Sequence, residues 1–176
     1  IGEGSELTKY SFGSRAGTHR LSQSINTELV NQLEKSVCNF YSFYFSLGPW
    51  GCEGLVRNNI RCSLLGEEAQ TNLYSMSLLS QKTHIDNNIF LKHMKPNCSS
   101  SQIFKGLYDD YSSGVFDSCV YVAKDAQKSN SVQSNKTVLL SDFASMNSNP
   151  QLEIFADDVA CAHGSTIGQI DAEGLF

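Results

Sequence analysis

Short segments rich in apolar residues alternate with polar breaks along most of the chain. The densest is the aromatic run at residues 38–45 (CNFYSFYF), whose residue types favour β-strands. Further segments of strand length lie at residues 55–65, 72–79, 103–108, 115–122, 137–140, 152–155 and 166–170. Many short strands without a strong helical pattern predict an all-β architecture.

The breaks between these segments carry residues that favour turns. Glycine, proline, asparagine, aspartate and serine gather at residues 48–49, 66–67, 86–88, 112–114 and 147–150. These residue types tolerate the backbone angles of tight turns or bond to their own backbone. We therefore predict a turn at each of these breaks.

The segment before the aromatic run supports two interpretations. Apolar residues recur every four positions from Leu29 to Val37, which predicts a helix over residues 26–37. Alternatively, residues 25–29 alternate as a strand and residues 31–35 form a turn. Periodicity alone does not decide between the two, but the aromatic run that follows favours the strand.

A weak internal repeat narrows the choice of fold. A turn, a small residue and then a strand-like segment recur at Ser5, Ser36, Ala69 and Ala126, which are 31, 33 and 57 residues apart. The last separation is close to twice each of the other two, as expected if one copy of the repeat was not detected. Recurrence at nearly fixed spacing is typical of a solenoid. A small residue fits the tight corner that stacked coils share. The pattern predicts a β-solenoid, and a β-sandwich is the alternative that it leaves open.

Composition excludes several classes of protein. The chain has 176 residues, a net charge of −5 and 18% charged residues, so it lacks the basic surface with which proteins bind nucleic acid. No apolar run approaches the roughly 18 residues of a membrane span. The chain opens on Ile1 without a signal-peptide pattern and closes on Phe176 without a tail. We expect residues 1–176 to be one domain cut from a longer protein.

The six cysteines are expected to be free thiols in a reducing compartment. They form no C-x-x-C pair, so a zinc ribbon is excluded, and about 3% cysteine is far below the content of disulfide-rich secreted domains. Three histidines also lack a metal-binding motif. His19 is expected at the surface, and His84 and His93 are expected to be solvated residues beside the predicted turn at 86–88.

The C-terminal stretch holds the strongest candidate site. If residues 159–163 are extended, Cys161 and His163 lie on the same face, about 7 Å apart along the strand. Such a thiol and imidazole can bind a soft or borderline metal, or form a thiolate–imidazolium pair. Another chain or a mobile cluster would have to complete the site. The alternative, which spacing alone favours, is that Cys161 is a small buried apolar residue and His163 its hydrogen-bonded neighbour.

Two carboxylate pairs suggest a different function. Asp109 with Asp110, and Asp157 with Asp158, would suit the acid–base chemistry of a β-helix carbohydrate-active enzyme. Adjacent strand residues face opposite ways, so neither doublet is itself a catalytic pair. This alternative requires carboxylates from neighbouring coils to converge beside a basic residue or a Ca²⁺ site.

Several blocks in the C-terminal part of the chain match a known family. The blocks are residues 139–142 (LLSD), 150–154 (PQLEI), 156–159 (ADDV) and 161–169 (CAHGSTIGQ), and residues 115–116, 126–128 and Gln133 also fit. From about residue 99 onward the chain resembles the SufB/SufD family, the scaffolds of the SUF iron–sulfur cluster assembly machine. SufB-like chains carry Glu after the histidine of the last block, whereas Gly164 follows His163 here, so the chain resembles SufD.

The resemblance implies a right-handed parallel β-helix, in agreement with the solenoid interpretation. It also implies a scaffold without catalytic turnover, which pairs with a SufB-like paralogue through the ends of the two β-helices. A transient iron–sulfur cluster forms at that junction, shared with the partner. His163 matches the family's histidine there and is the expected metal ligand, and Cys161 matches a cysteine frequent in SufD-like chains. Asp157 and Asp158 are expected to be structural.

The resemblance extends to partners and location. Family members carry helical regions before and after the core, largely absent from this chain, and the terminal one docks the ABC-type ATPase SufC. The expected compartment is a bacterial cytoplasm or the plastid stroma. Because a solenoid end is an open strand edge, we also expect that this chain can pair with a second copy as a homodimer.

Overall fold

The computed structural model describes residues 1–15, 21–46 and 53–169, and this part contains β-strands and no helix. One sheet, in spatial order, consists of β1 (Glu6–Arg15), β3 (Val37–Ser46), β5 (Gln70–Leu79), β7 (Ser99–Tyr108), β9 (Asn130–Leu139) and β11 (Ala160–Gln169). The other consists of β2 (Leu21–Gln32), β4 (Glu53–Leu64), β6 (Lys82–His93), β8 (Ser113–Val122) and β10 (Ser145–Ile154). The prediction of an all-β fold is confirmed. A helix long and apolar enough to span a membrane is not found among the described residues.

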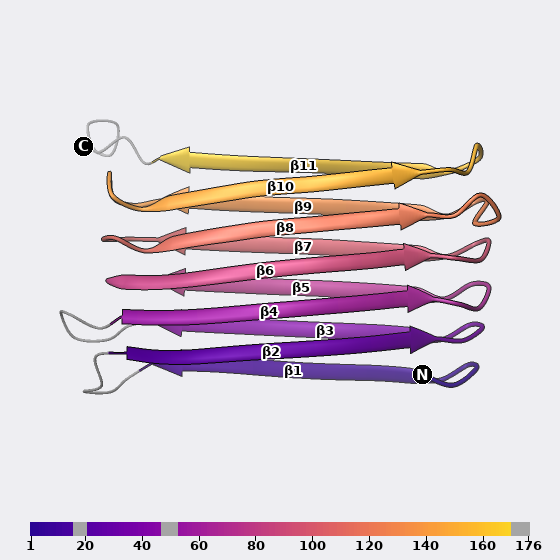
Figure 1. Cartoon of the computed structure of the whole chain (residues 1–176), viewed down its shortest axis with the longest axis horizontal. Coiled ribbons are helices and arrows are strands. Elements are labelled where there is room, and N and C mark those ends of the chain that lie inside the picture. Colours follow the sequence, from indigo (N-terminus) through magenta and orange to yellow (C-terminus); the bar gives the residue numbers. More distant parts are fainter. Residues whose placement is uncertain (16–20, 47–52, 170–176) are drawn as a thin grey trace, which may run out of the picture.

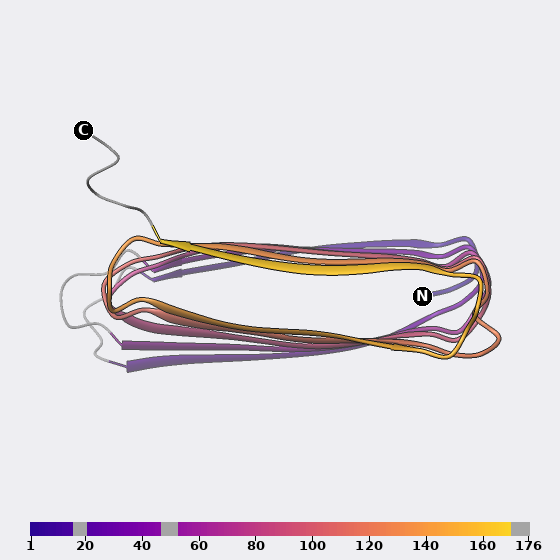
Figure 2. The same ribbon diagram turned by 90° about the horizontal axis from the view of Figure 1, so that it is seen from above.

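The strands wind into a β-solenoid of about five coils, each with one strand in either sheet. All strand pairs are parallel. In Figure 1 the chain runs right to left along the rear sheet, returns along the front sheet and rises, which is a right-handed winding. Figure 2 looks along the solenoid axis and shows flattened coils whose two sheets face each other. The solenoid prediction is confirmed over the β-sandwich.

Backbone hydrogen bonds continue through the corner that precedes each odd-numbered strand. The residues stacked at this corner are Ser5, Ser36, Ala69, Cys98 and Ser129, each accepting from the amide after the equivalent residue of the next coil at 2.8–3.0 Å. Three of the four small residues used to detect the repeat are therefore in register. The fourth, Ala126, lies three residues before the equivalent position, because the turn ahead of β9 is longer.

Burial alternates along the strands, so every second side chain lines the interior. In β8 each alternate residue from Gly114 to Val122 is buried. The rings of Phe104 and Phe116 pack at the centre, with centroids 4.9 Å apart. Burying an aliphatic or aromatic side chain of this size contributes about 1.5–3 kcal/mol, so this interior stabilises the solenoid.

The helix predicted over residues 26–37 is wrong, and the strand alternative holds. Residues up to Gln32 belong to β2, and a turn over residues 33–36 leads into β3. Val30 and Gln32 face the interior and are buried, whereas Leu29 is 75% exposed. The four-residue recurrence therefore combined residues from two sheet faces and a turn.

Two predicted turns are also wrong, because both lie within strands. Residues 86–88 are in the middle of β6, and residues 147–150 are in the middle of β10. Asn87 points inward, where its side-chain oxygen accepts a hydrogen bond from Asn58 at 2.8 Å. A stacked amide satisfies polar groups that would otherwise favour a turn. The strands β1 and β6 were not predicted, and the pattern found only the end of β9.

The remaining turn predictions have mixed outcomes. The turn at Gly66 is confirmed, and a side chain there would collide with the backbone of Leu33 and Glu34 in the coil below. Ser112 closes a turn, but β8 already begins at Ser113. The predicted turn at residues 48–49 lies outside the described residues.

Candidate functional site

The last coil of the described chain is open on its upper side. The strands β10 and β11 end their respective sheets, so each pairs with only one neighbour in the described part. In register, Cys161 pairs with Ser131 and His163 with Gln133, both of which are buried. Cys161 and His163 therefore belong to the inward-facing set of the solenoid. Since the described residues include no coil above them, Cys161 is half-buried and His163 is exposed.

Cys161 behaves as a packed thiol rather than a reactive one. It is free and lies against the apolar core cluster. Burial raises the pKa of this thiol, and a hydrogen bond from the backbone of Ser131 opposes that shift only in part. The thiol is therefore protonated near neutral pH, and a metal or a partner would be needed to convert it to a thiolate ligand.

His163 has both ring nitrogens available. Its side chain is exposed and has no hydrogen bond within the described residues. A neutral imidazole ligates iron through one nitrogen, while the other nitrogen fixes the orientation of the ring through a hydrogen bond. The residues beneath His163 therefore determine how it is presented.

A buried polar column lies beneath His163. Gln102 and Gln133 occupy the same register column in the two preceding coils. Ser118, on the opposite sheet, donates to Gln102 Oε1 at 2.6 Å and accepts from Gln133 Nε2 at 2.8 Å. Both glutamines are almost completely buried. This column was not predicted from the sequence, although the separation of 31 residues between the glutamines matches the spacing of the coils and could have revealed it.

Several buried polar atoms in these upper coils have no hydrogen-bond partner within the described residues. They are His93 Nδ1, Gln102 Nε2, Ser129 Oγ, Gln133 Oε1 and Ser148 Oγ. All belong to β6 or to later parts of the chain. Such groups are few in folded proteins, and each one calls for a water, an ion or a partner group.

The prediction that His84 and His93 are solvated turn residues is wrong. Both lie in β6, and His93 is fully buried with Nε2 2.9 Å from Ser100 Oγ. Burial lowers the pKa of His93 to about 4, so the ring is neutral at pH 7. His84 is half-buried, with Nδ1 2.7 Å from Ser113 Oγ. His19 lies outside the described residues.

The described cysteines, Cys38, Cys62, Cys98, Cys119 and Cys161, are all free, as expected, and Cys52 lies outside the described residues. Burial raises the pKa of Cys38 to about 11 and that of Cys62 to about 12. These two thiols are accordingly protonated at pH 7 and serve as small apolar residues of the core.

The carboxylates give no support to a carbohydrate-active enzyme. Asp110 accepts hydrogen bonds from the backbone and side-chain nitrogens of Gln81, at 2.9 and 2.7 Å, in a turn. Asp157 and Asp158 are exposed in the turn before β11. Across the described residues, no group of three or more His, Cys, Asp and Glu side chains is arranged to hold a metal ion.

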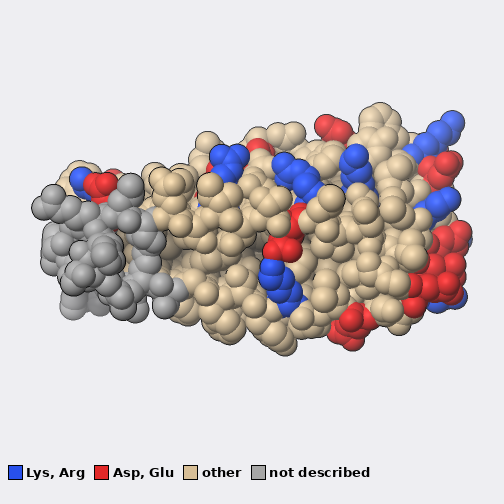
Figure 3. Space-filling view, turned by 60° about the horizontal axis from the view of Figure 1, so that its bottom comes forward, with Lys and Arg blue, Asp and Glu red and all other residues tan. Residues whose placement is uncertain are grey.

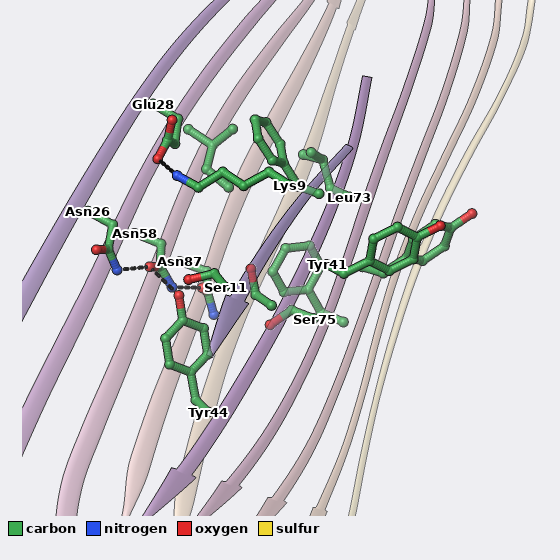
Figure 4. A pocket seen from close by; sticks show the side chains of 15 residues that line it. Lys9, Ser11, Asn26, Glu28, Tyr41, Tyr44, Asn58, Leu73, Ser75 and Asn87 are labelled. Carbon is green, nitrogen blue, oxygen red and sulfur yellow. Dashed lines mark hydrogen bonds and ion pairs between the residues drawn. The ribbon is translucent and has the colours of Figure 1, made fainter. Parts of the chain in front are cut away.

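The N-terminal end of the solenoid contains a hollow with a volume of about 40 Å³ (Figure 4). Asn26 donates to Asn58, which donates to Asn87, and Tyr44 donates its hydroxyl hydrogen to Asn58. Lys9 and Glu28 form an ion pair across the opening. Because these polar groups satisfy one another, the hollow has no group that requires a ligand.

Charged side chains also gather on the outside of the solenoid, at one of its corners. Figure 3 brings the N-terminal end forward and shows acidic side chains concentrated at the corner that carries the turns. Lys35 lies among them, and its pKa is raised first by its hydrogen bond to Glu34 and further by the charges of Glu34, Glu68 and Glu3. This corner is solvated and offers no enclosed site.

Comparisons with known proteins find relatives among iron–sulfur cluster assembly proteins. The chain is 34% identical to the iron–sulfur cluster assembly protein SufD of Escherichia coli over 136 residues, which are 77% of this chain and 31% of that protein. It is 32% identical over 122 residues to an iron–sulfur cluster assembly SufBD family protein of Synechocystis, covering 69% of this chain and 27% of that protein. It is 36% identical over 126 residues to the chloroplastic protein ABCI7 of Arabidopsis thaliana, covering 69% and 26%. The chain thus spans less than a third of each of these relatives.

The family assignment covers nearly the whole sequence. Residues 2–176 match the family described as SUF system FeS cluster assembly, SufBD core domain. The chain therefore belongs to the SufBD core domain family of the SUF system for iron–sulfur cluster assembly, and within that family it is SufD-like.

Proposed function

We propose that this chain is the β-solenoid core of a SufD-like scaffold subunit that pairs with a SufB-like paralogue and contributes His163 to a shared site of cluster assembly. In this proposal residues 1–176 are one domain of a longer protein, and the chain has no catalytic turnover of its own. ATP hydrolysis belongs to a SufC-like ATPase bound through a region outside this chain.

The observation that carries the proposal is the open end formed by β10 and β11. Unpaired strand edges are favourable sites for pairing with another sheet, so a second solenoid can continue both sheets. Pairing there would bring the partner against the inward-facing His163 and Cys161. The same edges would allow the homodimer expected from the sequence.

The chemistry of the two side chains suits a cluster that is passed on. His163 offers an exposed nitrogen to iron, and one or two ligands from each chain bind a cluster less permanently than four thiolates from one chain. Cys161 is a secondary contact, because its thiol must lose a proton before it can bind iron. The cluster is cargo here, and the chain keeps no resident cofactor.

The proposed location is a bacterial cytoplasm or the plastid stroma. The free cysteines support a reducing compartment. The relatives include a protein of Escherichia coli and one named as chloroplastic.

Anaerobic reconstitution tests the role of His163. Full-length protein would be co-purified with its SufB-like and SufC-like partners, loaded with iron and sulfide, and measured by absorption spectroscopy. We expect His163→Ala to retain the complex but to lower the cluster chromophore about tenfold or more, since even outer-shell changes alter metal affinity by about 10- to 100-fold.

The control is His84→Ala, which changes a half-buried histidine of β6 away from the open end. Its chromophore should match that of the wild type. An unchanged chromophore in His163→Ala would exclude the proposed ligand, and failure to form any complex with a SufB-like partner would contradict the pairing.

A further inference from the structure

The side-chain oxygen of Gln133 is a buried acceptor without a partner. Gln133 is 1% exposed, and its Nε2 donates to Ser118 Oγ at 2.8 Å and to the Ser118 backbone oxygen at 3.2 Å. A carbonyl oxygen only accepts hydrogen bonds, so the atom that faces it must be the amide nitrogen. This contact fixes which end of the amide is which. The remaining atom, Oε1, has no partner within the described residues.

Hydrogen bonds to the coil below do not involve this oxygen. Ser118 donates its own hydrogen to Gln102 Oε1, one coil below Gln133. The chain of donors therefore runs from Gln133 through Ser118 to Gln102. Because the amide nitrogen and oxygen diverge from one carbon, Oε1 does not share the contact with Ser118 and is left for a donor elsewhere in the interior.

His163 is the side chain stacked on Gln133 in that last coil. Stacking in a register column is close: the rings of Tyr10, Tyr41 and Tyr74 lie 5.2 and 5.3 Å apart between centroids. An imidazole above Gln133 is therefore within reach of its amide after a change of side-chain rotamer.

Among the described residues, the other sheet supplies no competing donor at this level. Pro150 is the register partner of Ser118 in the next coil, and its side chain has no hydrogen to donate. Ser118 donates to Gln102 in the lower coil, whereas Pro150, at the equivalent position of the next coil, cannot donate to Gln133.

Ser148 also has a buried hydroxyl, but it lies at a different level. Its register partner is Phe116, which packs against Phe104, and the column of Phe104 ends at Ser165. Ser148 consequently lies at the level of Asn135 and Ser165 rather than at that of His163.

We propose that Gln133 is a positioning residue for His163: its side-chain oxygen accepts a hydrogen bond from one ring nitrogen of His163 and leaves the other nitrogen free for iron. The inference rests on the proposed ligand role of His163 and adds the group that orients it. A neutral imidazole has one N–H and one lone pair, so a hydrogen bond to Oε1 selects one tautomer. The same bond satisfies the one unpartnered atom of Gln133.

The first test measures the tautomer of His163 without iron. Full-length, iron-free protein labelled with ¹⁵N-histidine would be studied by NMR, with His163→Ala used to assign the resonance. We expect one tautomer to dominate in the wild type, and Gln133→Met to change the tautomer ratio about fivefold, the factor supplied by one hydrogen bond of ordinary net strength. Gln133→Glu keeps an acceptor and, at alkaline pH where the imidazole is neutral, should keep the wild-type tautomer.

Gln32→Met is the matched control, since Gln32 is a buried glutamine that bonds to the backbone oxygens of Ser36 and Gln70 at the other end of the solenoid. It should lose similar thermal stability and leave the tautomer unchanged. If Gln133→Met and wild type share one tautomer ratio, the proposal is overturned. If Gln133→Met does not fold, a tautomer in Gln133→Glu that differs from the wild type overturns it equally.

The second test measures cluster loading in the complex with the SufB-like and SufC-like partners. We expect Gln133→Met to lower the chromophore about tenfold, Gln133→Glu to restore it, and Gln32→Met to leave it unchanged. A tautomer that depends on Gln133, together with full loading in His163→Ala, would keep the hydrogen bond and reject the ligand role. Loss of loading in His163→Ala with normal loading in Gln133→Met would keep the ligand role and reject the positioning role.

Discussion

The two ends of the solenoid differ in whether their polar side chains bond to one another. At the N-terminal end, Lys9 pairs with Glu28, and Asn58 is bonded to neighbours on both sides of the interior. At the C-terminal end, Cys161 and His163 stand on the open coil, and His163 has no hydrogen bond in the described structure. Both ends have strand edges, in β1 and β2 and in β10 and β11, but the polar side chains satisfy one another only at the N-terminal end of the described residues.

The interior follows the same division. Every buried side-chain atom without a partner in the described residues lies in β6 or later, and none lines the N-terminal hollow. Unsatisfied groups destabilise a fold, and natural proteins retain them mainly where function requires them. The contrast is the one expected if the N-terminal coils serve stability and the C-terminal coils hold the proposed site.

The largest effect on stability is expected at Asn58, in the N-terminal half. Asn58→Ala removes hydrogen bonds of 2.8 and 2.9 Å to Asn87, Tyr44 and Asn26, and leaves the first two, which are buried, without partners. Each unsatisfied buried group costs about 1–3 kcal/mol, so we expect a loss of about 3–5 kcal/mol in the free energy of unfolding. Urea denaturation of the 176-residue chain measures it.

Asn26→Ala provides the comparison for this prediction. Asn26 makes one bond of the same series at the outer end of the row, so its loss should cost only about 1 kcal/mol. Equal effects of the two substitutions would show that water enters the hollow and replaces the amide of Asn58. The polar groups of the N-terminal end would then depend on water and not only on one another.

A smaller effect, which depends on pH, is expected at His93 in the other half. Its pKa is about 4 in the folded chain because of burial, against 6.5 for an ordinary histidine. Between these values the unfolded chain binds the proton more tightly, so stability is present above pH 6.5 and is lost as the pH falls toward 4. The full loss is about 3 kcal/mol.

His93→Gln isolates this contribution, since glutamine can still bond to Ser100 and does not titrate. Urea denaturation at pH 7.5, 5.5 and 4.5 should show wild-type stability falling relative to the variant as the pH decreases. Parallel curves for the two proteins would mean that the folded chain holds His93 with an ordinary pKa, and that its buried ring nitrogen is hydrated.

The solenoid was predictable from the sequence because its corners are local. Ser36 and Ala69 follow turns whose chemistry is visible in single residues, and their spacing is the length of a coil. The interior was harder to predict, because Asn87 and Pro150 resemble turn residues when read alone. Their strand positions depend on Asn58 and Ser118, which lie 29 and 32 residues away in the adjacent coils.

The candidate site, like the fold, was predictable from the sequence only in part. Period-two alternation suffices to bring Cys161 and His163 to one face, which β11 reproduces. The burial of His93 and the column of Gln133 depend on which residues stack across coils, and that register becomes known only with the structure. The sequence therefore indicates the groups at the open end better than those beneath it.

The smallest effect is expected from the ion pair at the N-terminal end. The side chains of Lys9 and Glu28 are 43% and 31% exposed, and exposed pairs of this kind contribute about 0–1 kcal/mol, less at high salt. Lys9→Met should therefore change the free energy of unfolding by less than about 1 kcal/mol, and the full-length variant should load its cluster like the wild type. Glu28→Gln, which removes the other partner, should behave in the same way. A fall in cluster loading as large as that expected for His163→Ala would reject the division of roles between the two ends. A charge at the N-terminal end would then influence the proposed site at the C-terminal end.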